Sequence, residues 1–328
     1  MLAIFRTNQF AVNILLILYV LLIRSSIFIV ADENWAPTDA GVLAELFYAG
    51  VGSTGLYANL LACLLIFLQA LMVNMIVGQN RLANKITLFP GLFYILVASS
   101  LPEFLHLSPA LIANTFYIIA VRELLSIYNK SSSTGNLFNA GLWIGVASLC
   151  YMSYLSFVFL GIIAINILIA FRLKAILTFL SGIFVPFFLS AVYFFLIDQL
   201  PDFWNSIHLL SFSSEKYAAP NNWETYAKLG FFFFLLLVTI FSYGSYTSKK
   251  DLRAQKQISI LFWALVFSGL SILTPVTLPI EHLLLTALPL GIFLALSFLS
   301  LKPMQAEMFH MLLLIGILFM HLKPYWDF

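Results

Sequence analysis

The sequence of 328 residues is far too apolar for a water-soluble protein. Hydrophobic residues make up 62% of it and charged residues 9%, against about 25% charged in soluble domains, and its mean hydropathy is +1.00. Its 16 basic and 14 acidic residues cannot cover a soluble surface over 33 phenylalanines. A net charge of +2 gives no sign of a nucleic-acid partner. The composition is that of a membrane protein.

Apolar segments of about 15 to 23 residues follow one another along the chain. In lipid, backbone polar groups must be satisfied within a helix or a closed barrel, and barrel strands would alternate over ~10 residues. The sequence therefore predicts one integral membrane domain over residues 1–328, an all-α polytopic transmembrane helical bundle. About eleven helices are expected, at about 10–31, 55–77, 86–101, 107–121, 138–152, 155–171, 175–197, 229–246, 257–273, 283–300 and 308–322.

The loops between these segments differ in charge and length. Two longer polar stretches, 32–53 and 198–228, fall on the same side of the predicted membrane. Most acidic residues share that side, whereas most lysines and arginines, such as Lys250 and Arg253, lie on the other. The positive-inside rule then places the N-terminus in the cytoplasm, and it makes 32–53 the first outer loop and 198–228 a long outer loop between helices 7 and 8.

Local motifs for metals and disulfides are weak. Cys63 and Cys150 each lie inside an apolar segment, which predicts two small buried side chains rather than a disulfide. No Cys and His spacing typical of a zinc site occurs in the sequence. The five histidines are separated by whole spans, so their spacing gives little support for an iron site.

The first candidate residues surround the end of the first helix. Arg24 is the one charge inside an expected span; it can snorkel to the outer interface, pair with a carboxylate such as Asp32 or Glu103, or bind the phosphate of an amphiphilic ligand. Asp32 and Glu33 follow at the water boundary. That depth suits a general base acting between a lipid-carried donor and a water-side acceptor, while the neighbouring carboxylate binds a metal or a hydrogen-bond donor. A plain acidic turn is the alternative.

Two further polar corners are expected on the outer side. Glu103 and His106 form a compact turn between two short helices, and Glu281 and His282 begin a later helix. Each corner is a candidate substrate contact, with an ordinary polar hairpin or a helix N-terminal acid as the alternative. Trp35 and the tryptophans of the long outer loop are explained as aromatic anchors at the membrane boundary, although a groove for a polyprenyl lipid or a sugar would use the same residue types.

The order of these features resembles the multi-pass GT-C glycosyltransferases, the superfamily of the protein O-mannosyltransferases and the lipid A aminoarabinose transferases. The local part of the resemblance is Arg24 late in the first helix followed by Asp32-Glu33 at the start of the first outer loop. The architectural part is the first outer loop itself and the second long one, 198–228. The architecture covers the whole chain, whereas the motif covers three residues.

This resemblance implies a membrane glycosyltransferase of hexosyl or pentosyl type, with a polyprenyl-phosphate-linked sugar as donor and membrane lipids as partners. Asp32 would be the general base, Glu33 its neighbour, and Arg24 a support or a phosphate contact. No cofactor is required, and a divalent metal is compatible with the site. The sequence departs from the family where Asn34 and Trp35 replace the usual Tyr-Ala context, so a non-catalytic descendant is an alternative.

Two stretches, 100–114 and 136–141, also resemble an uncharacterised bacterial inner-membrane family whose members are sometimes labelled β-carotene monooxygenases. The expected location is accordingly the bacterial cytoplasmic (inner) membrane. The label implies a histidine-iron carotenoid oxygenase, which the scattered histidines support little. A non-enzymatic subunit of an envelope complex and a transporter are also compatible with the composition, although a transporter needs polar groups along its path and charges within the spans are almost absent.

Overall fold

The computed structural model describes residues 2–5, 10–29, 35–84, 87–128, 133–169, 171–207, 223–248, 250–273 and 279–322. This part of the chain is helical and contains no strand. Seven of its helical segments are long and apolar enough to cross a membrane. The predicted all-α membrane bundle is confirmed.

Each of the eleven predicted segments forms a helix. The elements are α1 (Leu2–Phe5), α2 (Phe10–Ile23), α3 (Ser26–Ile29), α4 (Val42–Val51), α5 (Leu56–Gln79), α6 (Phe89–Ala98), η1 (Pro102–Leu105), α7 (Pro109–Leu125), α8 (Thr134–Cys150), η2 (Met152–Ser156), α9 (Phe157–Ile169), α10 (Leu173–Leu196), α11 (Leu200–Ser206), α12 (Trp223–Thr247), α13 (Leu252–Leu270), η4 (Ser271–Leu273), η5 (Ile280–Thr286), α14 (Ala287–Ser300) and α15 (Pro303–Leu322).

Three details differ from the expected boundaries. The first span ends at Ile23 and is interrupted at Arg24, before the short helix α3. The first long loop contains α4, which ends in a turn where Gly52 and Gly55 take positive φ angles that favour glycine. The other long loop is shorter than expected, because α12 begins at Trp223.

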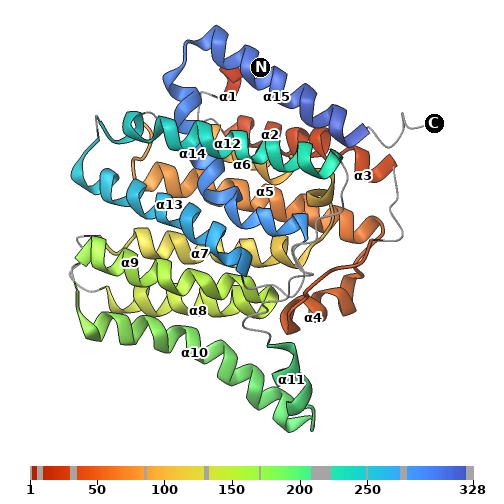
Figure 1. Cartoon of the computed structure of the whole chain (residues 1–328), viewed down its shortest axis with the longest axis vertical. Helices are drawn as coiled ribbons and strands as arrows, with labels where there is room; N and C mark the ends of the chain where they lie inside the picture. The colour runs from red at the N-terminus through yellow and green to blue at the C-terminus, as the bar shows by residue number, and fades with distance from the viewer. Residues whose placement is uncertain are drawn as a thin grey trace.

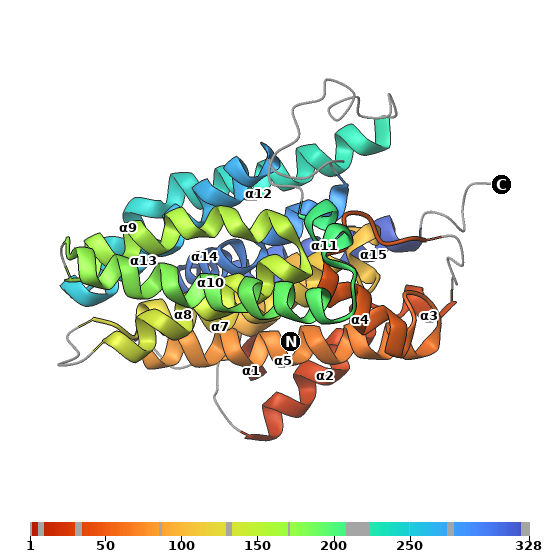
Figure 2. The same ribbon diagram turned by 90° about the horizontal axis from the view of Figure 1, so that it is seen from below.

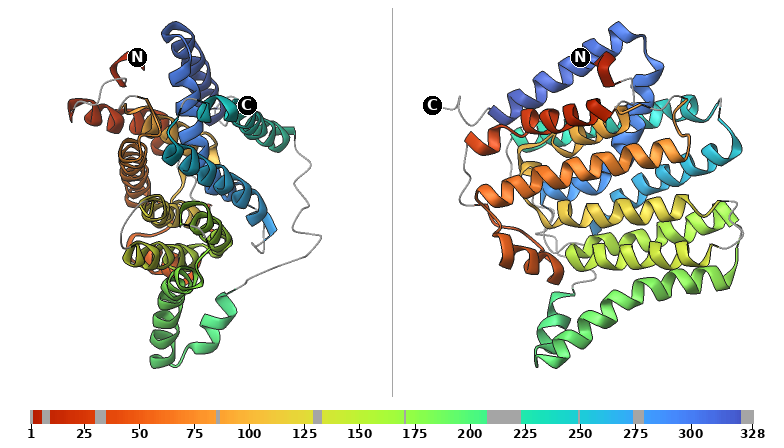
Figure 3. Two further views of the ribbon diagram at one scale, coloured as in Figure 1. Left: turned by 90° about the vertical axis from the view of Figure 1, so that its left-hand side faces the viewer. Right: turned by 180° about the vertical axis from the view of Figure 1, so that it is seen from behind.

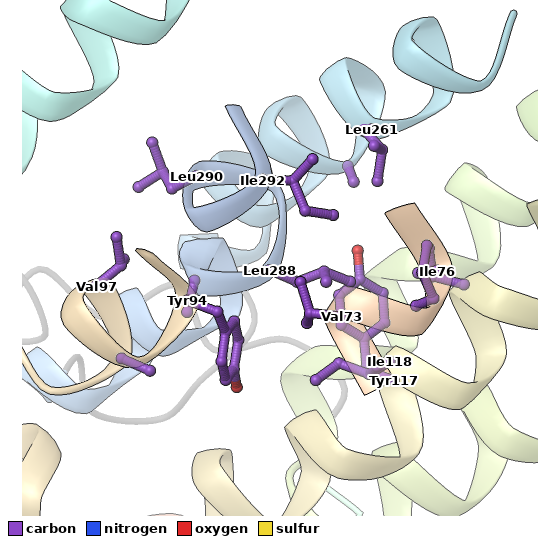
Figure 4. Packing of buried hydrophobic residues seen from close by; sticks show 14 of the residues in the cluster. Val73, Ile76, Tyr94, Val97, Tyr117, Ile118, Leu261, Leu288, Leu290 and Ile292 are labelled. Atoms are coloured by element: carbon purple, nitrogen blue, oxygen red, sulfur yellow. The ribbon is translucent and has the colours of Figure 1, made fainter. Parts of the chain in front are cut away.

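The long helices run side by side as a bundle whose two edges are α10 and α15 (Figures 1 and 3). α8 packs against both α7 and α10, and α6 lies between α5 and α14. α12 and α5 lie on opposite sides of α14, as the view from below shows (Figure 2). Side chains of α5, α6, α7, α13 and α14 interlock at the centre, among them Val73, Tyr94, Tyr117, Leu261 and Ile292 (Figure 4).

Helices α10 and α12 leave large apolar side chains uncovered. Leu196 on α10 is 73% exposed and Phe241 on α12 is 83% exposed. A soluble protein would bury such side chains, and the apolar contact with lipid tails makes their exposure favourable. With seven apolar helices of spanning length, the chain is a multi-pass membrane protein.

The charged residues divide between the two ends of the bundle. One end holds η1 and η5 and is called the site end below; most described acids, such as Asp202, lie there. Most described basic residues lie at the other end: Arg81, Arg122, Arg172, Lys174, Lys250, Arg253, Lys256 and Lys302. The helix order thus keeps the charge asymmetry expected of a protein with one cytoplasmic and one outer face.

This arrangement predicts which end a membrane-impermeant thiol reagent reaches. We expect Asp202→Cys to be labelled in intact cells, and Lys174→Cys only after permeabilisation, since both side chains are exposed at opposite ends. The native Cys63 and Cys150 are buried and free, so background labelling will be low. Labelling of both variants in intact cells would contradict the two-sided arrangement, and the reverse pattern would contradict the predicted orientation.

Candidate functional site

The structure brings the two predicted polar corners together. η1, which carries Glu103 and leads to His106, contacts η5, which carries Glu281 and His282. The corners are far apart in sequence, but each connects two antiparallel helices at the site end. Asp32 and Glu33 lie outside the described residues, so their predicted roles stay predictions.

Trp35 links the two corners. Its ring stacks on His106, with ring centroids 4.8 Å apart and planes inclined by 8°, and its Nε1 donates to Glu281 Oε1 at 3.1 Å. The sequence pattern favours a membrane anchor for Trp35 and does not indicate this link. Its position shortly after the acidic pair Asp32-Glu33 is the one signal in the sequence of a role at this site.

A small pocket opens beside Trp35 and Glu281. It is lined by Trp35, Thr38, Ser108, Pro109, Ala110, Tyr151, Pro279 and Glu281, and it is partly open to solvent. Its interior measures about 10 Å³, which is room for about one water molecule. Ligand pockets measure roughly 300–1,000 Å³, so a larger ligand would need these walls to move apart. The start of α7 forms one wall, where Ser108 caps the helix by accepting from the Leu111 N–H at 3.2 Å.

His282 is buried and is absent from the residues that line the pocket. Its Nδ1 lies 3.0 Å from the Tyr151 hydroxyl and its Nε2 lies 2.9 Å from Ser271 Oγ. His282 would therefore act on a group in the pocket only indirectly, through its hydrogen bond with Tyr151, which does line the pocket. The sequence does not single out Tyr151, because this residue lies near the end of the expected span 138–152.

Glu103 forms an ion pair with Lys228 on α12, and both side chains are partly exposed. The neighbouring Phe104 meets Phe232 of α12 edge-on, with ring centroids 5.7 Å apart. The second carboxylate oxygen of Glu103 is buried without a hydrogen-bond partner among the described residues. The ion pair thus ties the site end of α12, one of the least buried helices of the bundle, to the η1 corner.

Arg24 is fully buried and does not snorkel. Its Nη1 donates to Ser99 Oγ at 3.3 Å and to the Phe104 carbonyl at 3.1 Å, and its Nη2 donates to the Leu105 carbonyl. No described carboxylate pairs with it. The guanidinium therefore holds the backbone of η1, which is the structural role for this residue; phosphate binding by Arg24 stays a prediction.

α4 closes the site from the side of α8. The Gly41 N–H donates to the Cys150 carbonyl at 2.9 Å, and a Cβ at Gly41 would lie 2.3 Å from the Leu149 oxygen, so only glycine fits there. The Tyr48 hydroxyl donates to the Leu107 carbonyl at 2.8 Å. Burial raises the pKa of the Tyr48 phenol, which keeps it protonated for this bond.

No group of three or more potential metal ligands occurs among the described residues. His310 lies 2.8 Å from the Tyr19 hydroxyl, and Nδ1 of His321 lies 3.1 Å from the Ile23 carbonyl, both at the interface of α15 with α2. These histidines serve helix packing, and the described part of the chain offers no histidine cluster for an iron centre.

No protein-family model and no curated protein matches the sequence. Among solved structures, the chain is similar to ArnT from Cupriavidus metallidurans bound to undecaprenyl phosphate, with a TM-score of 0.50 and 13% sequence identity. The similarity covers 87% of this chain but 56% of that one, so the chain spans little more than half the length of ArnT. The architectural part of the predicted resemblance is thus confirmed, since the chain shares the fold of ArnT over most of its length.

Proposed function

We propose that this protein transfers a sugar from a polyprenyl-phosphate carrier to an acceptor at the outer face of the bacterial cytoplasmic membrane. The observation that supports this most directly is the polar site at one end of a GT-C-like bundle, where Trp35 joins the Glu103–His106 and Glu281–His282 corners. A neighbouring fold with undecaprenyl phosphate bound makes a lipid-linked substrate the natural candidate.

Within this proposal the lipid phosphate meets Lys228. Only two described cations lie at the site end, Arg24 and Lys228, and both terminal nitrogens of Arg24 already donate to protein acceptors. Lys228 is partly exposed on α12, which faces lipid over most of its length. A phosphate arriving along α12 would replace Glu103 as the partner of the ammonium group, a charge-assisted contact of the same kind.

The chemical step assigned to Asp32 is acceptor activation. As a general base Asp32 would remove the proton of the acceptor group while that group bonds to the anomeric carbon of the sugar, the bond from this carbon to the phosphate breaks, and the phosphate leaves with the carrier. Glu33 would orient the acceptor. Arg24 would fix the backbone of η1, and His106 would fix the ring of Trp35 by stacking on it. Glu281 and Trp35 would contact the sugar. No metal is required by these residues, and Asp32-Glu33 leave room for a divalent ion.

The proposal predicts a strong effect of Asp32→Asn. General acid–base catalysis contributes about 10²–10⁴-fold, so loss of undecaprenyl-phosphate-linked sugar from vesicles carrying the variant should slow at least 100-fold. Asp202→Asn, an exposed acid on α11 away from the pocket lining, is the matched control and should turn over normally. Normal turnover by Asp32→Asn would remove Asp32 from the mechanism, and no turnover by the wild-type chain with any carrier-linked sugar would reject the function.

A further inference from the structure

We propose that the end of the bundle opposite the site end binds a phosphate group, through Arg253 and Lys256 on α13 with Arg81 beside them. The phosphate can belong to the headgroup of an anionic phospholipid or to a soluble phosphate compound. The inference goes beyond the proposed transfer reaction and does not depend on it, because these residues lie at the other end of the helices from η1 and η5.

One buried asparagine joins three helices at this end. Asn80 caps the end of α5, and its Nδ2 donates to the Ile76 carbonyl at 2.9 Å, so its side-chain amide is fixed against its own helix. The Oδ1 atom of Asn80 accepts from Gln257 Nε2 at 2.7 Å and from Arg253 Nη2 at 3.2 Å. Gln257 also donates to the Leu125 carbonyl, at the end of α7, at 2.9 Å. The start of α13 is therefore held against the ends of α5 and α7.

This junction fixes two cations on one face of α13. Arg253 and Lys256 are three residues apart, a spacing that makes their side chains neighbours on a helix. Arg253 is exposed, and only one of its terminal nitrogens has a described partner, so its other N–H groups can donate to an acceptor from outside. Lys256 Nζ lies 5.4 Å from the centre of the Tyr128 ring, a contact that orients the ammonium group without neutralising it. Both side chains are thus held in place with their charges intact.

No described carboxylate forms an ion pair with either of these cations. The acids that lie near them in the sequence have other partners. Glu123 on α7 accepts from Asn136 Nδ2, and Asp251 interacts electrostatically with its neighbour Lys250. The segments that follow α5 and α7 in the sequence, 81–88 and 129–133, contain no acid. An anion that reaches the start of α13 therefore meets positive charge that the described part of the chain does not compensate.

The charge asymmetry of the bundle does not by itself explain this arrangement. The positive-inside rule concerns the number of basic residues near the membrane and requires no fixed geometry. Arg172 and Lys174 satisfy the rule at the same end of the bundle with exposed side chains that have no described side-chain partner. Arg253 and Lys256 are instead positioned by neutral partners, and the exposed Arg81 follows the cap of α5. A guanidinium fork next to an ammonium group is a donor set that suits the oxygens of a phosphate.

The test uses the full chain in detergent and three probes: dioleoyl phosphatidylglycerol, dioleoyl phosphatidylcholine and inorganic phosphate. Native mass spectrometry measures binding of the two lipids, and the rise in melting temperature measures binding of inorganic phosphate. A basic residue near an anionic headgroup contributes about 5-fold in affinity, so Arg253→Gln/Lys256→Gln should weaken binding of the anionic probe about 25-fold. Arg172→Gln/Lys174→Gln removes the same charge at the same end and is the matched control. It should weaken binding by about 2-fold or less, because distant exposed charges are screened.

The two arms of the test identify the source of the phosphate. Preferential binding of phosphatidylglycerol over phosphatidylcholine that Arg253→Gln/Lys256→Gln loses would assign a lipid headgroup. A response to inorganic phosphate that this variant loses, without a preference between the lipids, would assign a soluble compound. Should the double variant fail to fold, Arg81→Gln replaces it, because its exposed side chain has no described partner; binding should then weaken about 5-fold. Equal losses in the variant and its control, or no lipid preference together with no response to phosphate, would overturn the inference.

Discussion

Replacing Gly182 with leucine is expected to disrupt the pairing of α8 with α10 and to lower the thermal stability of the protein by several degrees. A Cβ at Gly182 would lie 2.2 Å from the Phe138 carbonyl oxygen, and one at Gly141 would lie 2.0 Å from the Phe179 carbonyl oxygen. These are backbone atoms, so the helices must separate to admit a side chain. Overpacking costs about 1–3 kcal/mol or more, and here it affects the most extensive packing contact that α10 makes among the described helices.

The control for this prediction is Gly230→Leu on α12, where nothing lies within 4 Å of the added Cβ. Leucine is a better helix former than glycine by up to about 1 kcal/mol, so this variant should be neutral or slightly stabilised. The thermal stability of both variants can be measured by heating them in detergent and monitoring the loss of monodisperse protein by size-exclusion chromatography. Equal midpoint temperatures of unfolding for the two variants would contradict the close contact of α8 and α10.

The helices of the bundle were predictable because the signal for each is local, although only seven of the described helical segments are long and apolar enough to cross a membrane. A run of apolar residues long enough to cross lipid must be helical whatever its neighbours are. The helix α4 also carried a local signal, with Val42, Leu43, Leu46 and Phe47 at helical spacing, but the surrounding polar loop concealed it. The interruption at Arg24 had no such signal, since 27–29 continue the apolar run and the acceptors of the guanidinium lie 75 or more residues away.

The site was predictable only in part, because its contacts join residues that are far apart in the sequence. The sequence indicates polar corners at Glu103, His106, Glu281 and His282, but nothing in it places the two corners in contact. By sequence Trp35 looks like Trp204, which is 61% exposed and fits the predicted role of membrane anchor. What distinguishes Trp35 is its bond to Glu281 and its stacking on His106, and both partners come from distant segments.

Substitution of Arg24 by leucine should open the η1 corner locally without unfolding the bundle. The guanidinium donates to two carbonyls of η1 and to Ser99, and leucine would leave these buried acceptors unpaired. Hydrogen bonds to charged groups are worth about 1.5–3 kcal/mol each, so amide exchange in a peptide covering 99–108 should accelerate by roughly 10–100-fold. Hydrogen–deuterium exchange with mass spectrometry measures this directly.

A local measurement is needed because global stability can change in either direction. Removing a buried cation also removes its desolvation cost, and replacing buried charges with apolar groups is often neutral or stabilising. Arg24→Lys is the matched variant: its ammonium lacks the planar fork that reaches Phe104 and Leu105 together, so exchange should be intermediate. The amide exchange rates of peptides from α8 and α10 should be the same in both variants as in the wild type. If 99–108 exchanges as slowly in Arg24→Leu as in wild type, the guanidinium does not hold η1, and the positions of Glu103 and His106 must depend on their contacts with Lys228 and Trp35 instead.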